Sequence, residues 1–241
     1  MQGEIHSVGD VIVPEDVRVD VKESTKFVIS NRDILKSGID TNHVEIIIYG
    51  EFYASGKREK RIKFEVQDTG EWFGIRYLPK SRVKIEHSVI KDAIKGLSLE
   101  AESVYVVLND ISKNQEGIEI FGGNSFIFAN KIYSNKIGVK AEIKSGFAIL
   151  SWNHIFKNES TGILIKDKPL LTLGNVYNSD TLDDGVNRIY GNGNYDIINL
   201  TQHKIHAQGN FWNSKDSTFI KSRIRGDVDF RKFYIWGEIK T

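Results

Sequence analysis

The chain has 241 residues, with 33 basic and 32 acidic side chains, a formal net charge of +1 and no cysteine. A chain of this length can bury a core without cross-links, and the lack of cysteine excludes a disulfide scaffold, a thiolate zinc site and a cysteine nucleophile. The balanced charge argues against nucleic acid as a partner, and no apolar run reaches the roughly 18 residues that predict a membrane span.

The first 41 residues contain short apolar segments that predict strands, at residues 11–14, 17–21 and 26–29. An apolar end of a stacked structure needs a cap, so we expect residues 1–41 to form an N-terminal cap with entry strands. Residues 1–6 lack a basic stretch followed by an apolar core, so we expect an exported form to have lost its leader already.

From residue 42 onward, two short motifs recur with one period. The first is a glycine followed by an aliphatic residue, any residue and usually another apolar residue. Its glycines, spaced by 22, 21, 21 and 24 residues, are Gly74, Gly96, Gly117, Gly138 and Gly162. Two motifs that share a period indicate a true structural repeat.

The second motif is an asparagine, any residue and usually an aliphatic residue, followed closely by a second asparagine. Its first asparagines, 21, 23 and 22 residues apart, are Asn109, Asn130, Asn153 and Asn175. The second asparagines are Asn114, Asn135, Asn158 and Asn178.

The segments between these motifs alternate over short stretches and are rich in β-branched and aromatic residues, as in residues 104–107 and 126–128. This pattern predicts strands joined by tight turns and leaves no room for the helical half of a leucine-rich repeat. Each unit therefore carries about three strands, and successive units stack in parallel at about 4.8 Å.

The Asn-x-Ile-x-x-Asn and Gly-Ile-x-Ile patterns resemble the right-handed parallel β-helix repeat of the pectate-lyase-like superfamily, over about residues 42–230. Residues 187–197 and 207–212 resemble its closing rungs. The resemblance implies one all-β domain, a single-stranded right-handed parallel β-helix of about seven or eight rungs, with rungs over 42–213 and a closing segment over 214–241. It also implies an extracellular, cell-surface or periplasmic location.

In such a stack, Asn130 is expected between Asn109 and Asn153, at a turn that tolerates left-handed backbone angles. Its amide would donate to one neighbour and accept from the other, which satisfies polar groups that water cannot reach. Sugar binding is the alternative role for these asparagines. The repeated glycines are expected to serve positive φ or tight packing and not a phosphate loop.

Alternation assigns side chains to faces of the sheets. After each repeated glycine, the residue between the two inward apolar positions should point outward. These outward residues are mostly polar, so this sheet should face water; they are Arg76, Ser98, Glu119, Lys140 and Leu164. If Val106 and Ile127 point inward, an apolar column points outward, made of Tyr105, Val107, Phe126, Phe128 and Ile149.

This outward apolar patch needs a cover or a partner. A first explanation is that the patch is covered by a loop or by the C-terminal segment, with Phe230, Phe233, Tyr234 and Trp236. The others are a protein–protein interface and an aromatic platform on which sugars stack. The candidate ligand-binding residues are Tyr105, Phe126, Phe128 and Trp152.

The richest acidic cluster holds Asp180, Asp183 and Asp184, which are weak catalytic candidates and could ligate Ca²⁺ as a cofactor. It also reads as a plain polar insertion between rungs, and no metal-ligand spacing is evident. We therefore expect a non-catalytic scaffold or binding module for polysaccharide or cell-surface assembly. The alternative is a carbohydrate-active enzyme, either a polysaccharide lyase or a glycoside hydrolase.

Overall fold

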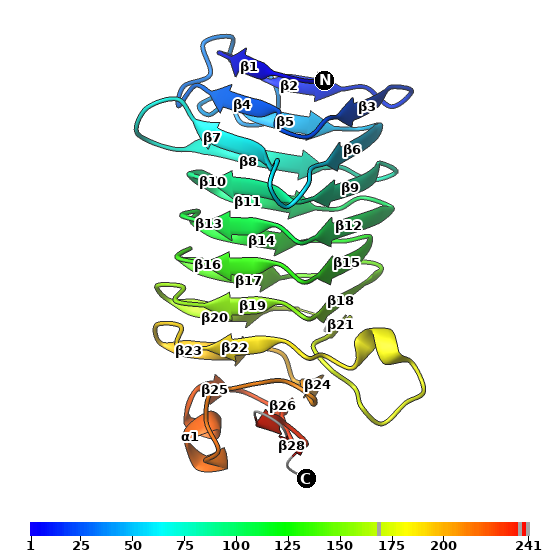
Figure 1. Ribbon diagram of the computed structural model, residues 1–241, viewed down its shortest axis with the longest axis vertical. Coiled ribbons are helices and arrows are strands. Elements are labelled where there is room, and N and C mark those ends of the chain that lie inside the picture. The colour runs from blue at the N-terminus through cyan, green and yellow to red at the C-terminus, as the bar shows by residue number, and fades with distance from the viewer. Residues whose placement is uncertain (168–169, 236–237, 240–241) are drawn as a thin grey trace.

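A computed structural model describes residues 1–167, 170–235 and 238–239 of the chain. The chain winds into a solenoid whose successive turns stack along one axis (Figure 1). Three parallel sheets form its walls, with eight, nine and seven strands, and we name them sheets A, B and C. The predicted all-β, right-handed parallel β-helix is confirmed.

Sheet A consists of β1 (Glu4–Ser7), β4 (Lys26–Ile29), β7 (Ile62–Val66), β10 (Ser88–Lys91), β13 (Asp110–Ser112), β16 (Lys131–Tyr133), β19 (His154–Phe156) and β22 (Arg188–Tyr190). Sheet B consists of β2 (Val11–Val13), β5 (Glu45–Ile48), β8 (Trp72–Tyr77), β11 (Ala93–Leu99), β14 (Glu116–Ile120), β17 (Ile137–Ala141), β20 (Thr161–Ile165), β23 (Tyr195–Asn199) and β25 (Ile224–Arg225). Sheet C consists of β3 (Arg18–Val21), β6 (Glu51–Ser55), β9 (Arg82–Glu86), β12 (Ser103–Val107), β15 (Asn124–Phe128), β18 (Phe147–Ser151) and β21 (Leu171–Thr172).

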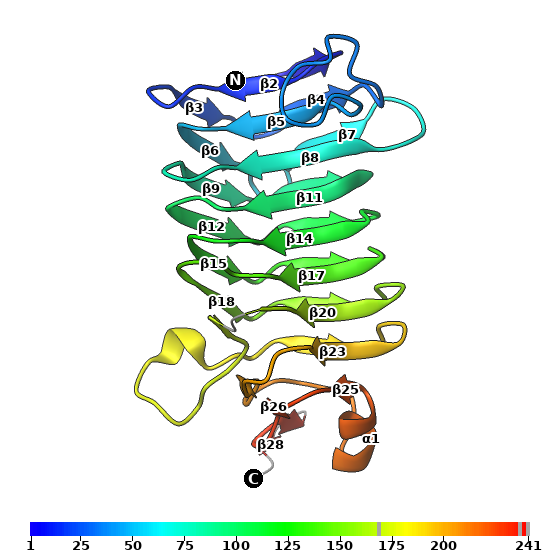
Figure 2. The ribbon, with the colours of Figure 1, turned by 180° about the vertical axis from the view of Figure 1, so that it is seen from behind.

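The solenoid begins earlier than residue 42, because β1, β2 and β3 already supply one strand to each sheet. Alternation at Val11 and Val13 and at Val19 and Val21 is enough to turn apolar side chains toward the core, although this first turn lacks the Asn and Gly motifs. The other end is irregular, with β24 (Ile205–His206), α1 (Ser217–Ser222), β26 (Val228–Asp229), β27 (Tyr234–Ile235) and β28 (Glu238–Ile239) (Figure 2).

The predicted asparagine ladder is present. Asn109 Nδ2 donates to Asn130 Oδ1 at 3.0 Å, and Asn130 Nδ2 donates to Asn153 Oδ1 at 3.0 Å. The ladder then continues through Asn187 to Asn210. Its members are buried, so each amide satisfies groups inside the corner between sheets C and A.

The prediction of Asn175 as the fourth ladder asparagine is wrong, because Asn153 bonds to Asn187 in the ladder. Residues 174–186 are an insertion that projects from the side of the solenoid and carries the 3₁₀ helix η1 (Thr181–Asp183) (Figure 1). A second ladder follows the other corner. It runs through Asn114, Asn135, Asn158 and Asn192 and ends on Asp196.

The left-handed residue at the corner precedes the asparagine, which corrects the expectation for Asn130. Ala129 has φ 55°, and the equivalent Leu108 and Trp152 have φ 58° and 63°. The left-handed residue turns the chain, so the next side chain points back inside, where an amide replaces the missing strand partners.

The repeated glycines serve tight packing. A Cβ at Gly117 would lie 2.6 Å from the Gly138 carbonyl oxygen and 3.0 Å from Asn135 Nδ2. The equivalent Gly96 lies against Asn114 in the same way. The two motifs share a period because the glycines from Gly96 to Gly162 each make space for an asparagine amide of the next turn, whereas a Cβ at Gly74 would meet the Lys95 carbonyl oxygen. Among the five, Gly74 alone has positive φ, at 127°.

The outer face of sheet B is less exposed than predicted. Ser98 and Glu119 are 4% and 6% exposed, although the alternation was expected to turn them toward water. Lys95 Nζ lies 2.5 Å and Lys140 Nζ 3.0 Å from the Glu119 carboxylate. Side chains of neighbouring turns, about 4.8 Å away, therefore cover the carboxylate and neutralise it.

Candidate functional site

The predicted ligand-binding aromatics lie on the outer face of sheet C. Tyr105 and Phe126 are register partners on β12 and β15, and Val106 and Ile127 between the outward positions are fully buried. The predicted inward and outward assignment is confirmed. Tyr105 remains 45% exposed, so this face presents apolar surface to solvent.

The ring geometry limits what this face can bind. The Tyr105 and Phe126 rings stack with centroids 5.0 Å apart and planes within 9°, and Phe128 lies 6.3 Å from Phe126. Phe147 meets Phe126 edge-on at 5.5 Å. Because stacked rings on adjacent strands face each other, they present mainly their edges to solvent, and together they form an apolar strip.

Trp152 lies beside this strip, at the corner that follows β18. The residue is 64% exposed, and its backbone N–H donates to the Gly185 carbonyl at 2.8 Å. In the part of the chain that the structure describes, no aromatic ring stacks on it. Of the described aromatic residues of this surface, Trp152 is therefore the most exposed.

Up to residue 235, the C-terminal segment lies at the end of the solenoid and not over the strip, which corrects this part of the first explanation. Phe230 packs against Trp212 and Phe233 at the end of the solenoid, and Tyr234 stacks on Phe211 in line with sheet A. Trp236 lies outside the described residues. A loop does reach the edge of this sheet, since the Ser151 hydroxyl at the end of β18 donates to the Leu182 carbonyl at 2.8 Å. The loop, protein-partner and sugar-platform explanations remain.

The acidic candidates belong to the insertion at residues 174–186. Asp180 Oδ1 accepts from the Leu182 N–H at 2.9 Å and caps η1. Asp183 accepts from Asn178 Nδ2 at 3.1 Å, and burial raises its pKa. These are contacts of a polar insertion between rungs. Within residues 1–167 and 170–235, Asp180, Asp183 and Asp184 join no group of three or more carboxylate or imidazole side chains suited to a metal ion.

A second aromatic row, which the sequence reasoning missed, lies on the outer face of sheet A. Tyr133 and Phe156 stack at 5.2 Å, and the His154 ring lies 4.0 Å from Phe156. The His154 Nε2 atom is 2.9 Å from the Tyr190 hydroxyl. The signal was available, because three ladder asparagines, Asn130, Asn153 and Asn187, are each followed by a basic residue or histidine, an isoleucine and an aromatic residue.

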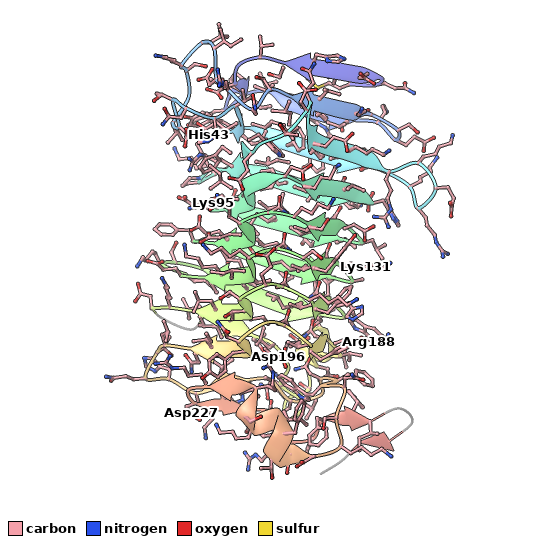
Figure 3. The ribbon with its side chains drawn as sticks, turned by 90° about the vertical axis from the view of Figure 1, so that its left-hand side faces the viewer. His43, Lys95, Lys131, Arg188, Asp196 and Asp227 are labelled. Carbon is pink, nitrogen blue, oxygen red and sulfur yellow. The ribbon has the colours of Figure 1, made fainter. Side chains whose placement is uncertain are left out.

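His154 lies between two cations in its column. It is the register partner of Lys131 on one side and of Arg188 on the other. Lys131 and Arg188 lie along the same side of the solenoid (Figure 3). Burial, and then the positive charges of Arg188 and Lys131, lower the pKa of His154. The C-terminal part of sheet A therefore combines rings with positive charge.

Comparison with protein families gives one match. A family model described as a right-handed beta helix region matches residues 73–186. No curated protein and no solved structure matches the chain significantly. Across the described residues, the structure contains no helix with the length and apolar character needed to cross a membrane.

Proposed function

The chain is a right-handed parallel β-helix repeat protein, and we propose that it is a non-catalytic binding module for polysaccharide. The observation that carries this proposal is the exposed apolar surface formed by the sheet C strip and the adjacent Trp152. This surface lies on a rigid stack of strands, which keeps the entropic cost of binding low.

A sugar ring binds to aromatic side chains through its apolar face, which requires an accessible ring face. Trp152, the most exposed of these rings, would offer such a face, while the stacked Tyr105 and Phe126 offer an apolar floor beside it. Polar groups at the margin include Asn124 on β15 and Lys84 on β9, which is paired with Glu86 at 2.8 Å. Hydrogen bonds from such groups would orient the sugar hydroxyls.

Binding is favoured over catalysis because of what the acidic candidates do. A glycosidase needs two carboxyl groups placed across a substrate, about 5–10 Å apart. Asp180 is engaged as a helix cap, and Asp183 is buried against Asn178. With the resemblance to pectate-lyase-like repeats, this surface fits a module that acts outside the cytoplasm, on cell-surface or extracellular polysaccharide.

The test is a glycan array followed by titration of the best ligand against two variants. Trp152→Ala should weaken binding about tenfold, or about 1.4 kcal/mol, with no loss of stability. The control is Tyr133→Ala, which removes an outward ring from sheet A and should leave this affinity unchanged.

A reducing-sugar assay on uronate polymers should show no turnover. Turnover that Asp183→Asn abolishes would overturn the proposal in favour of a carbohydrate-active enzyme. Equal affinity of wild type and the Trp152→Ala variant for every bound glycan would remove sheet C as the binding face.

A further inference from the structure

The loop between β4 and β5, residues 30–44, carries the most exposed large apolar side chains in the part of the chain that the structure describes. Ile34 is 69% and Leu35 67% exposed, and Ile39 follows at 52%. The loop lies at the N-terminal end of the solenoid, where Figure 3 labels His43. Single apolar residues are common on a protein surface, whereas adjacent ones at this exposure indicate a contact surface.

Buried carboxylates hold the backbone of this loop in place. Asp33 is 5% exposed, and its Oδ1 atom accepts from the Leu35 N–H at 2.9 Å. Glu45, which is fully buried at the start of β5, accepts from the N–H groups of Ile39 and Asp40 through Oε1. The exposed residues are therefore presented by an ordered loop, which lowers the entropic cost of an association.

The exposed pair lies against the corner between β1 and β2. The Ile34 N–H donates to the Val8 carbonyl at 3.2 Å, and a Cβ on Gly9 would lie 2.6 Å from Leu35 Cδ1. Val8 is itself 54% exposed. The first turn of the solenoid therefore supports the loop and adds a third exposed aliphatic residue beside its tip.

Two cations flank the exposed pair in the sequence. Arg32 precedes it and Lys36 follows it, and both side chains are exposed. Across the described residues, neither forms an ion pair. The two carboxylates of the loop, Asp33 and Asp40, instead accept backbone N–H groups of the loop itself. The loop thus engages its acidic groups internally and exposes aliphatic and basic ones.

From these observations we propose that this loop binds the surface of a lipid bilayer with anionic headgroups. Aliphatic side chains enter the region below the headgroups without a complementary pocket, and anionic lipids attract basic residues beside them. A second copy is disfavoured, because pairing would bring Arg32 and Lys36 of both chains together. The few exposed side chains also fall well short of the roughly 1,200 Å² that a stable protein interface buries.

The experiment is sedimentation of the full chain with vesicles of phosphatidylcholine alone, and with vesicles of equal parts phosphatidylcholine and phosphatidylglycerol. The partition coefficient should be at least about tenfold higher for the anionic vesicles. It should fall as salt is added, because salt screens the attraction. Equal binding to both kinds of vesicle, or no binding to the anionic ones, would overturn the proposal.

Variants locate the contact. Leu35→Ser should lower the partition coefficient for anionic vesicles about tenfold, because an apolar side chain no longer enters the bilayer. The matched control is Leu200→Ser, which changes a leucine that is 53% exposed after β23, and it should leave partitioning unchanged. The double variant Arg32→Gln, Lys36→Gln should bind anionic vesicles as weakly as neutral ones. Wild-type partitioning of a folded Leu35→Ser variant would contradict the site.

Two further measurements separate this proposal from its alternatives. Leu35→Trp keeps the tip apolar, and vesicles with brominated acyl chains should quench its fluorescence more strongly than that of the wild type; equal quenching would contradict insertion. A dimer that Leu35→Ser converts to monomers, seen by sedimentation velocity, would identify a second copy as the occupant and overturn the proposal. The Leu35→Ser variant should still bind polysaccharide, because the loop is separate from the sheet C surface.

Discussion

The middle of the solenoid and its C-terminal end solve the same packing problem in different ways. Between β10 and β20, neutral asparagine amides repeat turn after turn, and each is satisfied by its neighbours. At the end, the second ladder terminates on buried Asp196, whose pKa burial raises, and Arg223 lies 3.5 Å from it. Regular stacking therefore buries neutral amides, and the end of the stacking places a buried carboxylate beside a guanidinium.

The comparison teaches where binding chemistry can be sought in this molecule. In the regular turns, the inward residues, glycines and asparagines are committed to the stack. Outward residues are not part of these stacking contacts, and some of them form the aromatic rows on sheets C and A. Changes in the stack should therefore affect stability, and changes on the rows should affect binding.

The largest expected effect comes from breaking the first ladder. Asn130→Ala would leave the Asn109 backbone N–H without its acceptor. It would also remove the bonds from Asn109 Nδ2 to Asn130 Oδ1 and from Asn130 Nδ2 to the Val106 carbonyl and Asn153 Oδ1. We expect the free energy of unfolding to fall by about 3 kcal/mol, measured in urea. The control Asn124→Ala removes one bond at the surface, to the Glu102 carbonyl, and should cost about 0.5 kcal/mol. Equal losses would show that the ladder is not special.

A somewhat smaller effect is expected from Gly117→Ala. The new Cβ would lie 2.6 Å from the Gly138 carbonyl oxygen and would push the next turn away, at a cost of about 2 kcal/mol. At Gly122 the nearest atom is Ser145 Oγ at 3.3 Å, the end of a movable side chain, so Gly122→Ala should cost under about 1 kcal/mol. Thermal unfolding of both variants checks this. The reverse order would refute the account of the glycine period.

The ion pairs on sheet B predict a pH dependence. Although burial alone would raise the pKa of Glu119, its contacts with Lys95 and Lys140 lower it below the ordinary value of 4.5. Because the folded pKa lies below the unfolded one, the stabilisation is present above about pH 4.5 and is lost as the pH falls through the folded value.

Glu119→Gln should therefore reduce stability at pH 7 by about 1–2 kcal/mol, with a difference from wild type that shrinks in acid. Urea unfolding at several pH values measures it. A difference that stays constant down to the lowest pH would show that the carboxylate charge contributes nothing.

The smallest effect on stability is expected at the exposed corner. Trp152 has φ 63°, a conformation that glycine adopts freely, and Gly209 occupies the equivalent corner two ladder positions later at φ 65°. Trp152→Gly should therefore change the free energy of unfolding by less than about 1 kcal/mol, in either direction. A loss as large as that of Asn130→Ala would make Trp152 a structural residue and weaken its role in binding.

The fold could be predicted from the sequence because asparagine and glycine recur at the same positions of successive turns. Asn109, Asn130 and Asn153 lie 21 and 23 residues apart, and this spacing is the length of one turn. Alternation on β12 and β15 likewise placed Tyr105 and Phe126 outward.

The same reasoning failed where the period changes. Because of the insertion, the fourth ladder asparagine is Asn187, 34 residues after Asn153 in the chain. A constant spacing of about 22 residues predicts Asn175 instead. The end of sheet A could not be predicted, because Phe211 and Tyr234 continue it through single bridges that have no repeat motif in the sequence. The burial of Glu119 could not be predicted either, because it depends on the conformations of the Lys95 and Lys140 side chains from the neighbouring turns.

The most direct test of the central claim, that the stack and the binding surfaces are separate, is hydrogen exchange of side-chain amides followed by NMR. The Nδ2 protons of Asn109, Asn130 and Asn153 should exchange only through global unfolding, while the side-chain amide of the exposed Asn213 should exchange rapidly. Ladder amides that exchange as fast as Asn213 would contradict it.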